Sequence, residues 1–221
     1  MNFPDTLLPA QWILASWLVF VPLLGWVLYQ APWHELRKEA RLHQLLGACV
    51  LLLGIWSIKS GIKPGLDFRL LGATAMTLMF GPRLALFGLT LVLAGVTLAG
   101  MSGLASFAAN ALIMAVVPVL LSHAIYRLTD SKLPNNFFVY IFLNGFFGGG
   151  LAAYAAGLAT TLLMGASGTY SFDYLLSNYL PYFILLSWSE ALLTGMAMSL
   201  LVVFRPDWVS TFDDARYIRH K

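Results

Sequence analysis

Charged residues are scarce in this sequence: Asp, Glu, Lys and Arg make up 10% of its 221 residues, against about 25% in a typical soluble domain. Apolar residues account for 59%, and the mean hydropathy is +0.78. A soluble core of this size cannot hide so much apolar surface, so lipid must be the solvent for much of the chain. This excludes a soluble binding module. The net charge of +3 comes without a basic patch interleaved with aromatics, so we expect no nucleic-acid partner.

Several other features are absent. Cys49 is the single cysteine, which excludes an intrachain disulfide and indicates a small buried hydrophobe. There is no P-loop, so the chain does not bind ATP by that route. The HExxH and GxSxG motifs and dense Cys/His clusters are also missing. No Lys or Arg precedes the first apolar run, which follows Asp5. Because this is not a secretory signal, we expect the start of the chain to be retained.

Long apolar runs dominate what is present. They occupy residues 11–29, 43–58, 66–80, 84–99, 104–126, 137–164 and 179–204. At 1.5 Å per residue, most of these runs can span a bilayer as helices. The third is short, and it ends at Gly81-Pro82, where we expect a helix stop and a turn. The sequence therefore predicts an all-α fold: one transmembrane domain over residues 1–221, a polytopic bundle of about seven helices, and a short cytoplasmic tail over 205–221.

The basic residues predict the orientation, because cytoplasmic loops are enriched in Lys and Arg. With seven spans and the amino terminus outside, ten basic residues fall on the inner side and three on the outer side. The inner set is Arg37, Lys38, Arg41, Arg83, Arg127, Lys132, Arg205, Arg216, Arg219 and Lys221; the outer set is Lys59, Lys63 and Arg69. An even number of spans would scramble this asymmetry. We therefore expect the amino terminus outside and the carboxyl terminus in the cytoplasm.

Polar residues within or beside the runs are the candidates for function. Glu190 lies near the middle of the seventh run, where a carboxylate costs several kcal/mol unless it is paired, hydrated or protonated. It is either functional or a structural group bonded to a neighbouring helix. Asn110 is either a ligand or an interhelical hydrogen-bonding group. Asp67 and Arg69 open the third run and either line a site or form a solvated helix end.

Two further features of the sequence bear on catalysis and on subunit docking. Glu190 and His123 alone could serve as acid and base, but they lie at different depths and could not share a substrate. We therefore predict no enzyme, no catalytic residues and no cofactor. Gly149, Ala153 and Gly157 recur every four residues. Such a row lets two helices approach closely, either in docking another subunit or, as we favour, within the bundle.

Residues 65–82 (GLDFRLLGATAMTLMFGP) resemble the signature of the CbiM/NikM-type proteins. The stretches SFAANALIMAVVP around Asn110, FFVYIFLNGFFG at 137–148 and LLTGMAMSLLVVFRP at 192–206 resemble further family segments, and 206–217 resembles the tail of a proteobacterial branch. The resemblance implies a substrate-capture component of an energy-coupling factor ABC-type uptake transporter (a permease) for cobalt or nickel. It further implies a bacterial inner-membrane location, with a coupling transmembrane subunit and ATPase subunits as partners.

In that family, nitrogen atoms hold the metal: the terminal amine, a histidine at the second position, and a histidine before the Leu-Leu-Gly run. Such donors suit square-planar Ni(II). The resemblance carries these roles onto Met1 and Asn2 as metal-binding residues, and Arg69 stands where the second imidazole would be. The full set of candidate substrate-binding residues is Met1, Asn2, Asp67, Arg69, Asn110 and Glu190.

Both expected imidazoles are absent, and Arg69 would repel a bare cation. Several alternatives therefore stay open. The substrate is a cobalt or nickel ion, a different or chelated metal with Arg69 pairing an acidic chelator, or a small anion or organic molecule. The remaining alternative is a membrane protein that transports nothing, such as a structural or sensor subunit.

Overall fold

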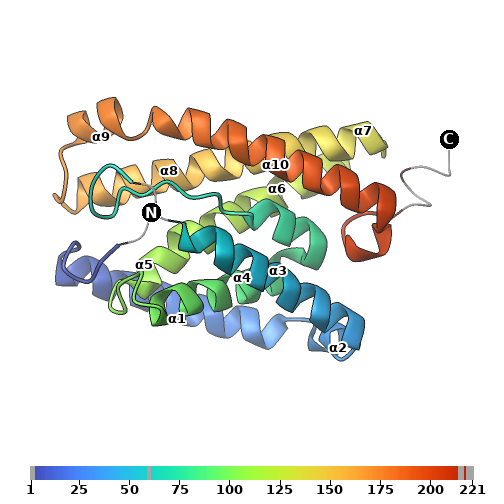
Figure 1. Cartoon of the computed structure of the whole chain (residues 1–221), viewed down its shortest axis with the longest axis horizontal. Helices are drawn as coiled ribbons and strands as arrows, with labels where there is room; N and C mark the ends of the chain where they lie inside the picture. The colour runs from blue at the N-terminus through green and yellow to red at the C-terminus, as the bar shows by residue number, and fades with distance from the viewer. Residues whose placement is uncertain (1–2, 59–60, 214–216, 218–221) are drawn as a thin grey trace.

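The computed structural model describes residues 3–58, 61–213 and 217, and within them the fold is helical with no strand. Figure 1 shows an elongated bundle with its helices along the long axis. The helices are α1 (Ala10–Gln30), α2 (Trp33–Leu36), α3 (Glu39–Ser57), α4 (Ala73–Leu98), α5 (Phe107–Ala111), α6 (Val117–Lys132), α7 (Phe137–Val139), α8 (Gly148–Ala166), α9 (Phe172–Asn178) and α10 (Tyr182–Phe204). The π-helices η1 (Leu112–Val116) and η2 (Tyr140–Phe147) join neighbouring α-helices, and η3 (Pro206–Trp208) is a 3₁₀ turn.

Six helical segments of the described chain are long and apolar enough to cross a membrane. They are Ala10–Gln30, Glu39–Ser57, Ala73–Leu98, Phe107–Lys132, Phe137–Ala166 and Tyr182–Phe204. This confirms the all-α polytopic bundle, with six such helices where we predicted about seven. The difference arises in α4, whose backbone breaks at Gly81 with φ 76° and ψ 164°. Only glycine adopts such a φ readily, and Pro82 follows it, so the predicted stop lies inside α4.

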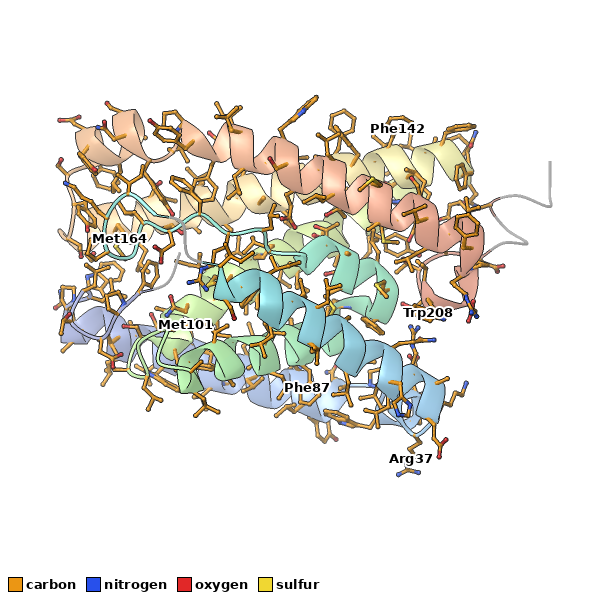
Figure 2. All side chains as sticks on the ribbon, viewed as in Figure 1. Arg37, Phe87, Met101, Phe142, Met164 and Trp208 are labelled. Carbon is orange, nitrogen blue, oxygen red and sulfur yellow. The ribbon has the colours of Figure 1, made fainter. Side chains whose placement is uncertain are left out.

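The loops gather at two opposite ends of the bundle. Hydrogen bonds and ring contacts show which segments lie together at each end. The mouth end comprises residues 3–8, 61–67, 100–106 and 167–174. The tail end comprises residues 30–41, 78–83, 126–140 and 205–213. In Figure 2, Met101 and Met164 lie toward the mouth end, and Arg37 and Trp208 lie at the tail end.

Residues 61–80 run from the mouth end to the tail end, and residues 82–98 run back. The break in α4 thus adds one pass to the six long helices, and the described chain travels between the two ends seven times. The third pass is non-helical over residues 66–72 and helical over 73–80. Our prediction of a helix over the whole third run was therefore wrong for its first seven residues.

The described part of the tail folds back against the third pass. The N–H of Thr211 donates to the carbonyl of Leu78, and the N–H of Ser210 donates to that of Met79. The Thr211 hydroxyl also donates to Leu78, at 2.8 Å. Because the break at Gly81 ends the helix, these carbonyls lack donors from a following turn. The tail supplies these donors instead.

The row of small residues on α8 packs inside the bundle. A side chain at Gly149 would come within 3.0 Å of Thr194, and one at Gly157 would overlap Phe183. Both neighbours belong to α10. This geometry agrees with the packing interpretation that we favoured, because the close approach of α8 and α10 uses the row.

Candidate substrate site

A cavity of about 420 Å³ opens at the mouth end, where three loops meet. Its walls come from the amino-terminal segment, the loop before the third pass, and the loop after α4. The lining residues are Pro4, Asp5, Pro64, Gly65, Asp67, Gly100, Met101, Ser102 and Gly103. Of the predicted site residues within the described chain, Asp67 lines this cavity, whereas Arg69, Asn110 and Glu190 do not.

The amino-terminal segment enters the bundle. Phe3 is fully buried, and its N–H donates to Asn110 Oδ1 at 2.9 Å. Asn110 Nδ2 donates back to the Phe3 carbonyl at 3.3 Å and to Ser102 Oγ at 2.9 Å. Asn110 therefore fixes the amino-terminal segment to α5 and to the loop after α4. The predicted ligands Met1 and Asn2 lie outside the described residues.

Asp5 holds the other side of the same segment. Its Oδ1 accepts hydrogen bonds from the N–H groups of Ala105 at 2.7 Å and Ser106 at 3.2 Å. The N–H of Gly103 donates to the Phe3 carbonyl at 3.2 Å, and a side chain at Gly103 would overlap Asp5. The segment and the loop after α4 therefore form one closely fitted wall of the cavity.

Arg69 lies in the non-helical half of the third pass and is 3% exposed. Its Nη1 donates to the carbonyl of Trp56 at the end of α3. Its Nε and Nη2 are buried and have no hydrogen-bond partner among the described residues. The carboxylate of Asp67 contributes a favourable electrostatic interaction. The guanidinium is therefore fixed at one nitrogen and unsatisfied at the other two.

Phe68 points to the opposite wall from Arg69 and packs against the start of α10. Its ring lies 5.4 Å from that of Tyr179 and 5.5 Å from that of Phe183. Arg69, by contrast, bonds to α3. The third pass is therefore held between α3 and α10, and the side chain of Arg69 is fixed toward α3.

Glu190 is 3% exposed and binds the backbone of the third pass. Its Oε2 accepts from the N–H of Leu71 at 2.9 Å, and its Oε1 accepts from the N–H of Gly72 at 2.6 Å. These N–H groups lie where α4 begins, and an acceptor there satisfies donors that a helix start leaves unpaired. Of our two interpretations of Glu190, this geometry favours the structural carboxyl.

Metal-ligating side chains do not gather in the described chain: no three His, Cys, Asp or Glu residues come together there. His34 and His43 belong to α2 and the first half of α3, near the tail end. The ring of His123 interacts electrostatically with Arg127 and Arg83, also toward the tail end. None of these histidines replaces the imidazoles that the third pass and position 2 lack.

The sequence pattern did not reveal several partners in this region. Trp56 accepts from Arg69 through its carbonyl and donates through Nε1 to the Leu71 carbonyl at 3.3 Å. Ser102 supplies a hydroxyl to Asn110. Backbone carbonyls carry no sequence signal, and a serine in a loop has many uses. One signal was present in the sequence: Phe3 is an apolar residue that lies before Pro4 and Asp5, outside the first run. In the structure this side chain is buried.

The sequence profile of the CbiM family, described as the cobalt uptake substrate-specific transmembrane region, matches residues 2–208. The chain belongs to the CbiM family. This confirms the family resemblance, and the proteobacterial branch stays a prediction. None of the curated proteins compared gives a significant match. As a CbiM family member, the protein is a membrane component of metal uptake.

Two solved structures share the fold of this CbiM family member. A crystal structure of a truncated transition metal transporter superposes with a TM-score of 0.78 at 23% identity, covering 92% of this chain and 99% of that one. A crystal structure of a transition metal transporter gives 0.78 at 23% identity, covering 91% and 92%. The fold is thus shared over nearly the whole chain.

Proposed function

We propose that this protein is the substrate-capture component of an energy-coupling factor uptake transporter for a transition metal, cobalt or nickel. The observation that carries the proposal is the insertion of the amino-terminal segment, with Phe3 buried and bonded to Asn110 beside the third pass. This geometry brings the start of the chain toward the segment that holds the family signature. Met1 and Asn2 would then supply the terminal amine and the backbone amide as metal ligands.

The orientation and the partners belong to the same proposal. The described basic residues of the predicted inner set all lie toward the tail end, and Lys63 lies at the mouth end, over Tyr174. This distribution supports a mouth end outside and a tail end in the cytoplasm of a bacterial inner membrane. Because the chain has no P-loop, a coupling transmembrane subunit and ATPase subunits would drive transport.

Uptake of radioactive nickel and cobalt tests the transport proposal directly. Cells that express this chain with a coupling subunit and ATPases should accumulate metal, and cells that lack any one of these subunits should not. Accumulation at the same rate without the ATPases would overturn the energy-coupling proposal. ATP hydrolysis by the purified chain alone would also contradict it.

Metal binding to detergent-purified protein with a native, untagged amino terminus tests the ligands. Titrations with nickel and cobalt should be compared with those of the Asn2→His, Arg69→His double variant, which restores both imidazoles. Tight binding by the native protein supports Met1 and Asn2 as ligands. Binding by the double variant alone means that the scaffold is competent and that the natural substrate is not a bare ion. Binding by neither removes the support for a metal site at these positions.

A further inference from the structure

The free edge of Arg69 has a definite shape. Nη1 is fixed by the Trp56 carbonyl, whereas Nε and Nη2 have no acceptor among the described residues. Nε and Nη2 form one side of the planar guanidinium, and their two N–H bonds run nearly parallel. Such an edge matches the two oxygens of a single carboxylate, which it binds through paired hydrogen bonds.

A buried guanidinium with two unpaired nitrogens is unfavourable, because each unmade bond leaves a desolvated donor. Within transmembrane bundles, a buried arginine is rare and marks a substrate pathway or a paired charge. The carboxylates nearby do not satisfy this edge. Both oxygens of Glu190 accept backbone N–H groups, and Asp5 binds the loop after α4. Asp67 helps to balance the charge, yet Nε and Nη2 stay without a bond.

Arg69 is close in sequence to a residue that lines the mouth cavity. Asp67, two residues before Arg69, lines the cavity, and both belong to the non-helical start of the third pass. Both nitrogens of the free edge are buried, so neighbouring residues must move before a ligand reaches the edge.

We propose that Arg69 binds a carboxylate of an acidic metal chelate through its Nε and Nη2 edge, so that the transported species is a chelated rather than a bare ion. This inference rests on the proposed transport function and names its substrate class. A fixed guanidinium repels a free divalent cation and attracts an anionic complex of the same metal. The chelator also supplies ligands in place of the imidazoles that the chain lacks.

Binding of defined nickel complexes to the native protein tests the inference without any substitution. The probes are nickel citrate, the cationic complex of nickel with triethylenetetramine, bare nickel and metal-free citrate, each followed by calorimetry and thermal stabilisation in detergent. Nickel citrate should bind at least about tenfold more tightly than the amine complex, since one charge-assisted bond gained is worth about tenfold or more.

The Arg69→Lys variant keeps the charge and removes the planar edge. It should weaken nickel citrate binding by about tenfold to a hundredfold. Arg205→Lys, a matched change of an exposed arginine at the tail end, should leave binding unchanged. If Arg69→Lys does not fold, the comparison of the two complexes on the native protein still decides.

The outcomes separate this inference from the proposed function. Equal binding of the two complexes, or no binding of nickel citrate, overturns the carboxylate assignment and leaves metal uptake to be judged by the radioactive assay. Tight binding of bare nickel without a response to citrate overturns the assignment and supports a metal site. Metal-free citrate binding as tightly as nickel citrate supports a carboxylate site and contradicts metal as the substrate.

Discussion

The third pass joins two halves of opposite character. Residues 66–72 are non-helical, and their backbone forms hydrogen bonds with side chains of other elements, chiefly Glu190 and Trp56. Residues 73–80 form helix, and their last carbonyls are satisfied by the tail through Ser210 and Thr211. The first half borders the mouth cavity, and the second half packs at the tail end.

The difference shows what a non-helical segment needs at membrane depth. Irregular backbone there is tolerated only where protein or enclosed water supplies hydrogen bonds, because lipid supplies none. Glu190 provides two of those bonds, through the N–H groups of Leu71 and Gly72. A helix over 66–72 would form its own backbone hydrogen bonds, but successive side chains would then point in directions that rotate around the helix axis. The non-helical half instead fixes Phe68 toward α10 and Arg69 toward α3.

Removing the carboxylate of Glu190 should break this arrangement most strongly. Glu190→Ala leaves the N–H groups of Leu71 and Gly72 buried without acceptors. We expect a loss of about 2–5 kcal/mol in the free energy of unfolding, measured by thermal or chemical unfolding in detergent. Ser189→Ala is the control, since the Ser189 hydroxyl bonds only within its own helix, at 3.1 Å. Equal stability of the two variants would contradict a stabilising role for the hydrogen bonds from Leu71 and Gly72 to Glu190.

Releasing the amino-terminal segment should have the next largest effect. Asn110→Ala removes both bonds to Phe3 and the bond to Ser102. We expect about 2–3 kcal/mol of lost stability, since a buried donor and acceptor are left unpaired. Hydrogen exchange of residues 3–8 should rise much more than that of α8. Asn178→Ala, an exposed asparagine at the mouth end, should leave exchange in residues 3–8 unchanged.

The tail end offers the matching test on the helical half. Thr211→Val removes the hydroxyl that donates to the Leu78 carbonyl and contacts Tyr140 Oη at 2.6 Å. We expect a loss of about 1–2 kcal/mol, read by thermal unfolding. Ser210→Ala should cost less, because the Ser210 hydroxyl makes a single bond of 3.5 Å. A larger effect from Ser210 than from Thr211 would contradict the proposed role of the hydroxyl.

The smallest effect is expected at the surface of the mouth. Lys63 lies 4.1 Å from the ring centre of Tyr174, an exposed cation–π contact. Lys63→Met should cost about 0.5 kcal/mol. The measurement is unfolding beside Lys132→Met, an exposed lysine at the tail end. A loss as large as that of Asn110→Ala would mean that Lys63 holds the loop before the third pass more firmly than this contact accounts for.

Much of the fold followed from local sequence. The apolar runs predicted the spans, because a bilayer requires long helices whatever else the chain does. Gly81-Pro82 predicted the break, since glycine permits the required φ and proline removes a donor. The signature at 65–82 predicted the family that the profile match then confirmed. At the site, Asp67 lines the mouth cavity, and its role in substrate binding stays a prediction, as do those of Asn110 and Glu190.

The sequence by itself determined that the protein is a membrane bundle, where its helices break, and which imidazoles its third pass lacks. Only the tertiary structure decided that residues 66–72 are not helical, because their hydrogen bonds come from Glu190, 118 and 119 residues away. It likewise joined Phe3 to Asn110 across 107 residues and left one edge of Arg69 without a hydrogen-bond partner among the described residues. Local propensity cannot encode such contacts, since the same residues stay helical unless a distant side chain offers their backbone a better partner.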